Sequence, residues 1–255
     1  MALAVMASAL IMGACSVKED RAACPCLLVL DFSEAGQEHD GSASLFLAAD
    51  GTPVLSDVIP LTEYLGNSYI VSVPRTKMDL MLWYGGDGMV SESGLMIPFG
   101  EDCPEIYMFG ASFTASGERH DELVHLHKNH CRMTIHAAGD VSVPLSMQVT
   151  GNVAGYDGKG KPVEGLFRYG MDYTDLQEGH DVILPRQVDS SLRLLINDRD
   201  DEVKVFALGH YLESCGYDWT AADLDDVTVT VDFALTEVRL SVKGWDGVYT
   251  YEIDF

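Results

Sequence analysis

Cys15 lies in a sequence context that indicates a covalent modification. It follows a largely apolar, uncharged stretch from Leu3 to Met12 and the small residues Gly13 and Ala14. The stretch is long enough for an export signal but too short to cross the ~30 Å hydrocarbon core of a bilayer. Cleavage before Cys15 would make it the first mature residue, and a diacylglyceryl thioether with an acylated amine would supply the paired chains that stable anchoring requires. The sequence therefore predicts lipid attachment at Cys15. The alternative is that residues 1–14 form a buried element and Cys15 is an ordinary thiol.

A second motif has the glycine and lysine spacing of a phosphate-binding loop. It runs from Gly155 to Lys161, but Pro162 stands where such a loop needs a hydroxyl to bind magnesium. The residues that follow, Val163, Glu164 and Gly165, cannot open the long helix whose N-terminus would hold a phosphate. We expect a flexible surface loop here and no phosphate chemistry.

Several histidines lie close together in the middle of the chain. His120 and His125 are five residues apart, whereas the zinc-protease helix needs histidines four apart. His125, His127, His130 and Cys131 could share a metal if the first two project from one strand face, but nothing in the sequence fixes the geometry that zinc requires. We expect no metal site.

The remaining candidates are acidic runs and tryptophans. The runs Asp198–Glu202 and Asp223–Asp226 lack the spaced carboxylates and central glycine of a calcium loop, so we expect solvated turns. Trp83, Trp219 and Trp245 would serve either as core residues, which we favour, or as a platform for sugars. No nucleophile elbow or pair of catalytic carboxylates can be identified. The sequence predicts no enzyme activity and no cofactor.

The elements that must position these residues are strands. In Val227–Phe233 the Val and Phe side chains alternate with Thr and Asp, which is the pattern of a half-buried strand. Short runs of this kind, separated by Gly, Pro, Asn and Asp, favour an all-β sandwich fold. Asp50-Gly51 predicts a hairpin turn, and helix is expected mainly at Leu208–Ser214, before Gly216.

Composition excludes several classes of partner. The 255 residues carry a formal net charge of −24, which repels nucleic acid and anionic membrane surfaces. Of the six cysteines, five remain once Cys15 is lipidated, and Cys24 and Cys26 are too close for an easy internal bridge. A disulfide framework is therefore not expected, although one long-range bridge stays open.

Four segments follow from these features. Residues 1–14 form a lipoprotein signal peptide and residues 15–23 a lipidated tether. Residues 24–118 form an N-terminal β-sandwich domain and residues 119–255 a C-terminal one. The boundary between the two domains is placed at the polar stretch Ala115–Arg119 because no low-complexity linker divides the chain.

Motifs along most of the mature chain resemble one family. Cys15, the charged triplet Lys18-Glu19-Asp20 and the strand that begins at Cys24-Pro25-Cys26 resemble the start of the fimbrium anchoring subunits of Bacteroidales type V pili. Three further segments are similar to parts of these subunits. Leu45–Gly51 is similar to their second strand and its turn, and Asp79–Gly86 to a strand that ends in Trp and glycines. Leu123–Thr134 is similar to the opening strands of their second domain.

The resemblance implies two tandem transthyretin-like β-sandwich domains with very little helix. It implies a lipoprotein of the outer membrane, exposed at the cell surface, that anchors or terminates a fimbria through strand-mediated contact with shaft or accessory pilins. Lys18, Glu19 and Asp20 are similar to a surface-export signal of this phylum, and a plain charged spacer is the alternative. No small-molecule substrate is expected. The alternative function is a surface lipoprotein that binds glycans through a β-sandwich domain.

Strand exchange in such subunits completes an open sheet with an extended segment of a neighbour. An open edge leaves backbone N–H and C=O groups unpaired, and a donated strand pairs them. The candidate strands in this chain are Cys26–Phe32 and Tyr249–Phe255. Phe255 falls on the apolar face of its strand, from which we expect the chain to end inside a sheet.

Overall fold

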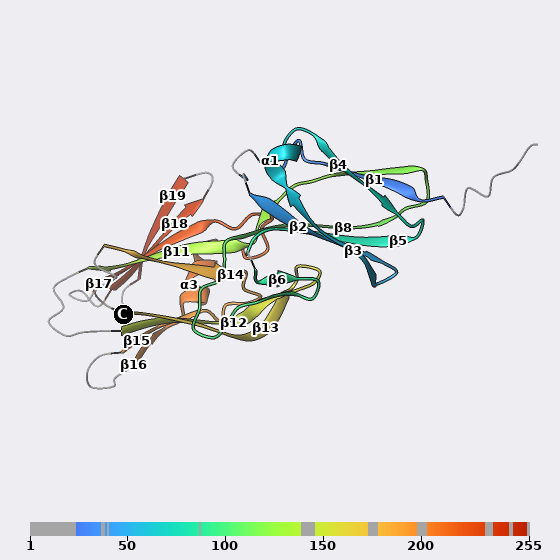
Figure 1. The fold of residues 1–255 in the computed structure, drawn as a ribbon. Helices are drawn as coiled ribbons and strands as arrows, with labels where there is room; N and C mark the ends of the chain where they lie inside the picture. Colours follow the sequence, from blue (N-terminus) through green and yellow to red (C-terminus); the bar gives the residue numbers. More distant parts are fainter. Residues whose placement is uncertain are drawn as a thin grey trace, which may run out of the picture.

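The described part of the chain folds into β-sheets (Figure 1). The structure is a computed structural model that describes residues 24–36, 39, 41–86, 88–138, 146–172, 178–197, 203–232, 237–244 and 247–253. Within them, helix is limited to α1 at Leu61–Tyr64 and α3 at Leu208–Ser214. The predictions of an all-β sandwich with very little helix, and of a helix before Gly216, are confirmed.

The N-terminal half forms a pair of sheets. In the first, β1 (Cys26–Asp31) is the central strand, antiparallel to β4 (Ser68–Val73) and parallel to β9 (Arg119–Leu123). The second has five strands in the order β10 (His127–Lys128), β8 (Ile106–Thr114), β5 (Lys77–Gly85), β2 (Ser42–Ala49) and β3 (Thr52–Pro60).

The alternation of buried and exposed side chains along the strands explains how these two sheets pack against one another. In β2, Ala43, Leu45 and Leu47 are buried and belong to one apolar cluster with residues of β1 such as Leu28 and Leu30. The side chains between them point to the other face of the sheet. The predicted hairpin turn is confirmed, because Asp50 and Gly51 join β2 to β3 with φ angles of 48° and 79°, as a two-residue turn of this type requires.

The C-terminal half forms a second pair of sheets. One has the order β14 (His180–Pro185), β11 (His130–Ala138), β17 (Asp226–Asp232), β18 (Glu237–Gly244) and β19 (Gly247–Ile253). The other has the order β16 (Val203–Phe206), β15 (Arg193–Asn197), β12 (Ser146–Asp157), β7 (Gly94–Met96) and β6 (Val90–Ser91), with β13 (Pro162–Asp172) paired to β12.

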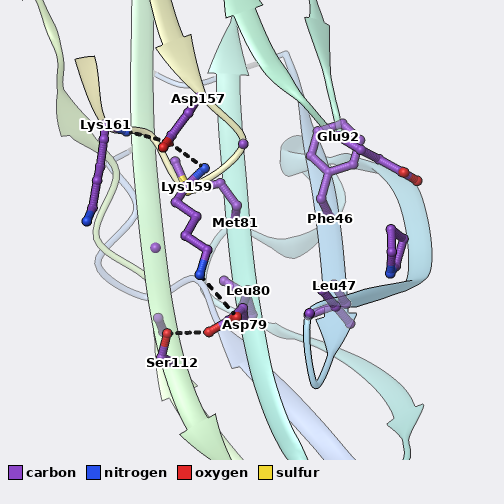
Figure 2. Close-up of a pocket in the computed structure, with 16 residues that line it drawn as sticks. Phe46, Leu47, Asp79, Leu80, Met81, Glu92, Ser112, Asp157, Lys159 and Lys161 are labelled. Carbon is purple, nitrogen blue, oxygen red and sulfur yellow. Dashed lines mark hydrogen bonds and ion pairs between the residues drawn. The ribbon is translucent and has the colours of Figure 1, made fainter. Parts of the chain in front are cut away.

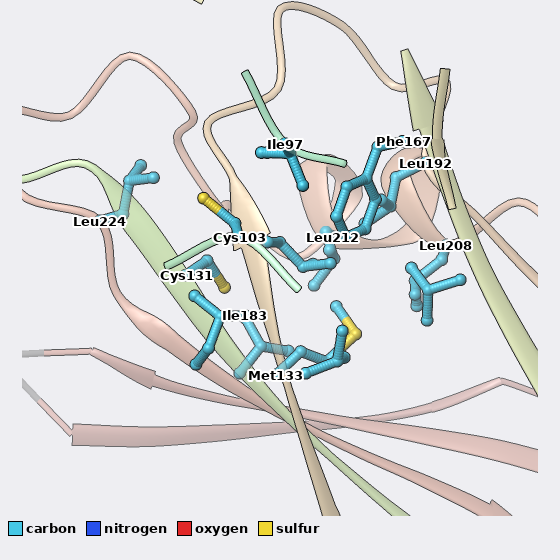
Figure 3. Close-up of a cluster of buried hydrophobic side chains, with 14 of the residues drawn as sticks. Ile97, Cys103, Cys131, Met133, Phe167, Ile183, Leu192, Leu208, Leu212 and Leu224 are labelled. Atoms are coloured by element: carbon cyan, nitrogen blue, oxygen red, sulfur yellow. The ribbon is translucent and has the colours of Figure 1, made fainter. Parts of the chain in front are cut away.

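The core of the second half reaches into the first half. Its buried side chains come mainly from β11, β12, β14, β15, β17 and α3, and Figure 3 shows part of this cluster, including Cys103, Cys131 and Phe167. Four members lie on strands of the first pair of sheets: Met81, Trp83, Ile106 and Met108. The rings of Trp83 and of Tyr156 from β12 pack in a T-shaped arrangement, with 6.3 Å between the centroids. This cluster is therefore a core that the two halves share, beside the separate cluster within the first half.

Strand pairing also passes between the halves. β9 follows the predicted domain boundary at residue 118 but joins the first pair of sheets beside β1. β6 and β7 precede that boundary, yet β7 pairs with the end of β12 in the second pair. A division into independent domains after residue 118 stays a prediction.

Candidate functional site

The predicted N-terminal candidate strand is integral to its sheet. Each residue of β1 is paired with β4, from Cys26 opposite Val73 to Asp31 opposite Ser68, and β9 pairs with the other edge. Leu28 and Leu30 are fully buried. A partner strand can therefore join this sheet beside β4 or β9, whereas it cannot pair with β1 unless one of them is displaced.

The predicted C-terminal candidate strand lies at a sheet edge. β19 is antiparallel to β18 from Val238 opposite Ile253 to Gly244 opposite Gly247, and among the described residues no strand pairs with its other edge. An edge of this kind presents backbone donors and acceptors to an incoming strand. Phe255 lies outside the described residues.

The predicted lipid-attachment and export residues are not part of the described structure. Cys15, Lys18, Glu19 and Asp20 all precede Cys24, the first described residue. None of the helices in the described part of the chain combines the length and hydropathy of a membrane span.

The phosphate-loop motif forms a hairpin turn. β12 ends at Asp157 and β13 begins at Pro162, so that a strand and not a helix follows the turn. The carboxylate oxygen Oδ1 of Asp157 accepts hydrogen bonds of 2.9 Å from the backbone N–H groups of Lys159 and Lys161. A side chain of the chain itself thus occupies the donors that would bind a phosphate. The prediction of a surface loop is right for residues 158–161 and wrong for Gly155 and Tyr156, which belong to β12, where Tyr156 is 1% exposed.

The histidines are held by separate partners. His125 pairs with Glu34, and the His127 ring nitrogen Nδ1 lies 3.2 Å from the Asp223 carboxylate. His130 is 2% exposed, its Nδ1 accepts the Ile106 N–H at 3.0 Å, and burial lowers its pKa. No group of three metal-ligating side chains occurs within the described ranges.

Two residues of the acidic run at 223–226 bind residues of β10 and β11. The Asp223 carboxylate accepts the backbone N–H of Lys128 at 2.7 Å. The Asp226 carboxylate accepts the Lys128 ammonium at 2.5 Å and the backbone N–H of Arg132 at 2.9 Å. These carboxylates have a structural role that the sequence alone does not reveal. The run Asp198–Glu202 lies outside the described residues.

The described tryptophans are core residues. Trp83 and Trp219 are 1% and 5% exposed, so neither presents a ring face to a sugar. The prediction of core packing is therefore confirmed for both. Trp245 lies outside the described part of the structure.

One cavity in the described part of the chain is a groove beside the junction of the two halves. It has a volume of about 670 Å³ and lies over β2, β5 and β8, next to the β12–β13 turn (Figure 2). The strands contribute Phe46, Met81 and Ser112, the turn contributes Lys159, and the β6–β7 turn contributes Glu92. Since its walls come from segments far apart in the chain, sequence patterns gave no signal for this groove.

One ionic network crosses the groove. The Ser112 hydroxyl donates to the Asp79 carboxylate at 2.6 Å, and the Lys159 ammonium lies 3.5 Å from the other carboxylate oxygen (Figure 2). The Ser112 hydrogen bond, and to a lesser degree the charge of Lys159, lower the pKa of Asp79. The carboxylate is therefore ionised near neutral pH, and the 68% exposed Lys159 side chain extends over the sheet.

Similar solved structures come from the Bacteroidales. A candidate polysaccharide-binding protein from Bacteroides thetaiotaomicron is 13% identical, with a TM-score of 0.66 over 90% of this chain and 98% of that chain. The fimbrial anchor protein Mfa2 from Porphyromonas gingivalis is 10% identical, with a TM-score of 0.60 over 89% and 100% of the two chains. A candidate adhesin from Bacteroides ovatus is 11% identical, with a TM-score of 0.58 over 89% and 95%.

This chain shares their fold. The predicted resemblance to fimbrial proteins of the Bacteroidales is thus confirmed at the level of structure. No family model matches the sequence, and no curated protein matches it. At identities of 10–13% the similarity establishes a common architecture, while the roles named for Mfa2 and the others belong to those proteins.

Proposed function

We propose that this chain is a structural lipoprotein of a fimbria, which anchors or terminates the filament at the outer membrane. The observation that carries the proposal is the common fold with the fimbrial anchor protein Mfa2 over the full length of that chain. The described residues also contain no group of three metal-ligating side chains. His125, His127 and His130 have separate partners, and the two described tryptophans are buried. A structural role uses the fold as it stands and needs no catalytic group.

Contact with a pilin would use a sheet edge. β19 offers an edge that no described strand covers, and β1 is held between two neighbours. The proposed partners are shaft or accessory pilins that pair with such an edge. The net charge of −24 opposes binding to nucleic acid and to anionic lipid surfaces.

Anchoring would depend on lipid at Cys15. The tether at residues 15–23 contains Lys18, Glu19 and Asp20, which would act as the surface-export signal. Mass spectrometry of the mature N-terminal peptide tests the anchor, and a diacylated Cys15 is the expected result. An unmodified peptide that begins at Met1 would contradict it.

A cell experiment tests the role in the filament. We expect Cys15→Ala to release fimbriae into the medium or to change their length, as seen by electron microscopy of cells and supernatant. Cys24→Ala is the matched control, because Cys24 is an exposed thiol and its loss should leave the fimbriae unchanged. Fimbriae of normal length and attachment in the Cys15→Ala strain would contradict the proposal.

The alternative function predicted from the sequence is glycan binding, for which the tryptophans are candidate contact residues. Trp83 and Trp219 are buried, so this alternative loses two of its candidate contact residues. One solved structure with the same fold is described as a candidate polysaccharide-binding protein, and a glycan site in this chain would have to lie elsewhere.

A further inference from the structure

The groove beside the junction has the size of a small-ligand site. Its volume of about 670 Å³ lies within the range of roughly 300–1,000 Å³ that is common for such sites, which often occur between domains. It is lined by the sheet face of β2, β5 and β8 and by the two turns described above (Figure 2). The fimbrial role makes no use of this groove.

Apolar and small residues of the sheet form the floor of the groove. Phe46 supplies an aromatic ring, and Met81 and Ala48 line the floor beside it. Gly110 adds no side chain, and a Cβ at this position would lie 3.2 Å from the Met81 sulfur. A flat apolar face of a ligand can therefore approach the sheet closely.

The walls carry charges of both signs. The residues that line it include three acidic ones, Asp79, Glu92 and Asp157, and two lysines, Lys159 and Lys161. These charges nearly cancel, so a strongly anionic or cationic ligand gains little net attraction. A neutral ligand with many hydroxyl groups can donate to the carboxylates and accept from the lysines.

Lys159 can turn toward a ligand at little cost. Its ammonium lies 3.5 Å from the Asp79 carboxylate, and its side chain is 68% exposed. Exposed ion pairs of this kind contribute little to stability. The Asp79 carboxylate keeps its hydrogen bond from Ser112 when Lys159 moves.

We propose that this groove binds a neutral oligosaccharide. A sugar ring has an apolar face that can stack on Phe46 and hydroxyl groups that can reach Asp79 and Lys159. The inference goes beyond the fimbrial role and does not depend on it, because the groove residues are separate from Cys15 and from β19.

The test is a titration of the folded chain with neutral hexasaccharides of glucose, mannose, galactose and N-acetylglucosamine. Isothermal titration calorimetry should show saturable binding of at least one of them at up to millimolar concentration. Polyglutamate and heparin serve as anionic probes in the same assay. Binding of an anionic probe alone, or of no neutral hexasaccharide, would overturn the proposal.

Variants place the binding in the groove. Phe46→Ala should weaken binding about tenfold through the lost stacking surface, and Lys159→Ala should weaken it severalfold. Gly110→Val should weaken binding because its side chain would fill part of the groove floor, and this change removes no polar group. The matched controls are Phe99→Ala and Lys204→Ala, because both residues are exposed and lie outside the groove.

The controls should bind as the unchanged chain does. If Phe46→Ala fails to fold, as judged by thermal unfolding, Lys159→Ala and Gly110→Val decide the question. Equal losses in groove and control variants, or full affinity in Lys159→Ala and Gly110→Val, would refute the site.

Discussion

At the scale of residues, the Tyr156 hydroxyl joins segments that are far apart in the chain. It donates to the backbone oxygen of Asn129 at 2.5 Å and accepts the backbone N–H of Arg186 at 2.7 Å. The Arg186 guanidinium in turn donates to the Asn129 side chain and to the backbone oxygens of Trp219 and Ala221. This hydrogen-bond network thus adds polar contacts to the apolar ones at the junction of the two halves.

Removal of the hydroxyl should destabilise the fold. Tyr156→Phe leaves the Arg186 N–H and the Asn129 oxygen without their partner in a buried site, which costs about 1–3 kcal/mol. Urea unfolding measures the loss. Tyr211→Phe is the control, because Tyr211 is only partly buried, and its change should stay within about 0.5 kcal/mol. Equal stability of the two variants would contradict this role of Tyr156.

Asp102 should make stability depend on pH. Partial burial raises its pKa from 3.8 to about 6, although the Ile183 N–H donates to it at 3.1 Å. Because the folded-state pKa is raised, the folded state gains relative stability at low pH and loses it as pH rises from about 4 to about 6.

Asp102→Asn should therefore stabilise the protein near neutral pH. Its amide oxygen can still accept the Ile183 N–H, and it does not ionise. We expect the free energy of unfolding near neutral pH to rise by about 1–2 kcal/mol after allowance for solvent screening, and to change very little below pH about 4. Unfolding measured across this range checks the effect, and a gain that is independent of pH would contradict the assignment.

At the scale of elements, β1 holds the first sheet together. It is paired on both edges and buries Leu28 and Leu30. Leu30→Ala should cost about 2–5 kcal/mol because it opens a cavity in the core. Leu27, on the same strand, is 46% exposed, and Leu27→Ala should cost less than about 1 kcal/mol. Thermal unfolding distinguishes the two, and similar losses would show that β1 does not have this central role.

Strands that alternate could be predicted from the sequence, whereas some edge strands could not. The pattern of Val227–Phe233 predicts β17 at Asp226–Asp232, because one face of that strand is buried. β3 and β13 have no such signal. Each carries proline or glycine within its range and lies at an edge, where few side chains are buried and these residues are tolerated.

The groove and the Tyr156 network could not be predicted from sequence patterns, because their residues lie far apart in the chain. Asp79 and Lys159 are separated by 80 residues, and Asn129 and Arg186 by 57. Their proximity follows from strand order, which local periodicity does not determine. The Asp157 turn, in contrast, is local, and the sequence predicts a loop at the residues that follow Asp157.

At the scale of the whole molecule, the shared core should make the two halves unfold together. Trp83 and Met108 from the first half are buried among residues of the second, and β7 pairs with β12. Scanning calorimetry should therefore show one transition whose calorimetric and van't Hoff enthalpies agree. Two separated transitions would indicate that the halves are independent.

The central claim is that the molecule is a subunit of a fimbria. Cross-linking mass spectrometry of fimbriae isolated from the native cell surface tests it most directly, because cross-links identify neighbouring chains. The account predicts cross-links between this chain and a pilin, with contacts near β19. Recovery of this chain from the surface without any cross-link to a pilin, while pilins cross-link to one another, would contradict the account.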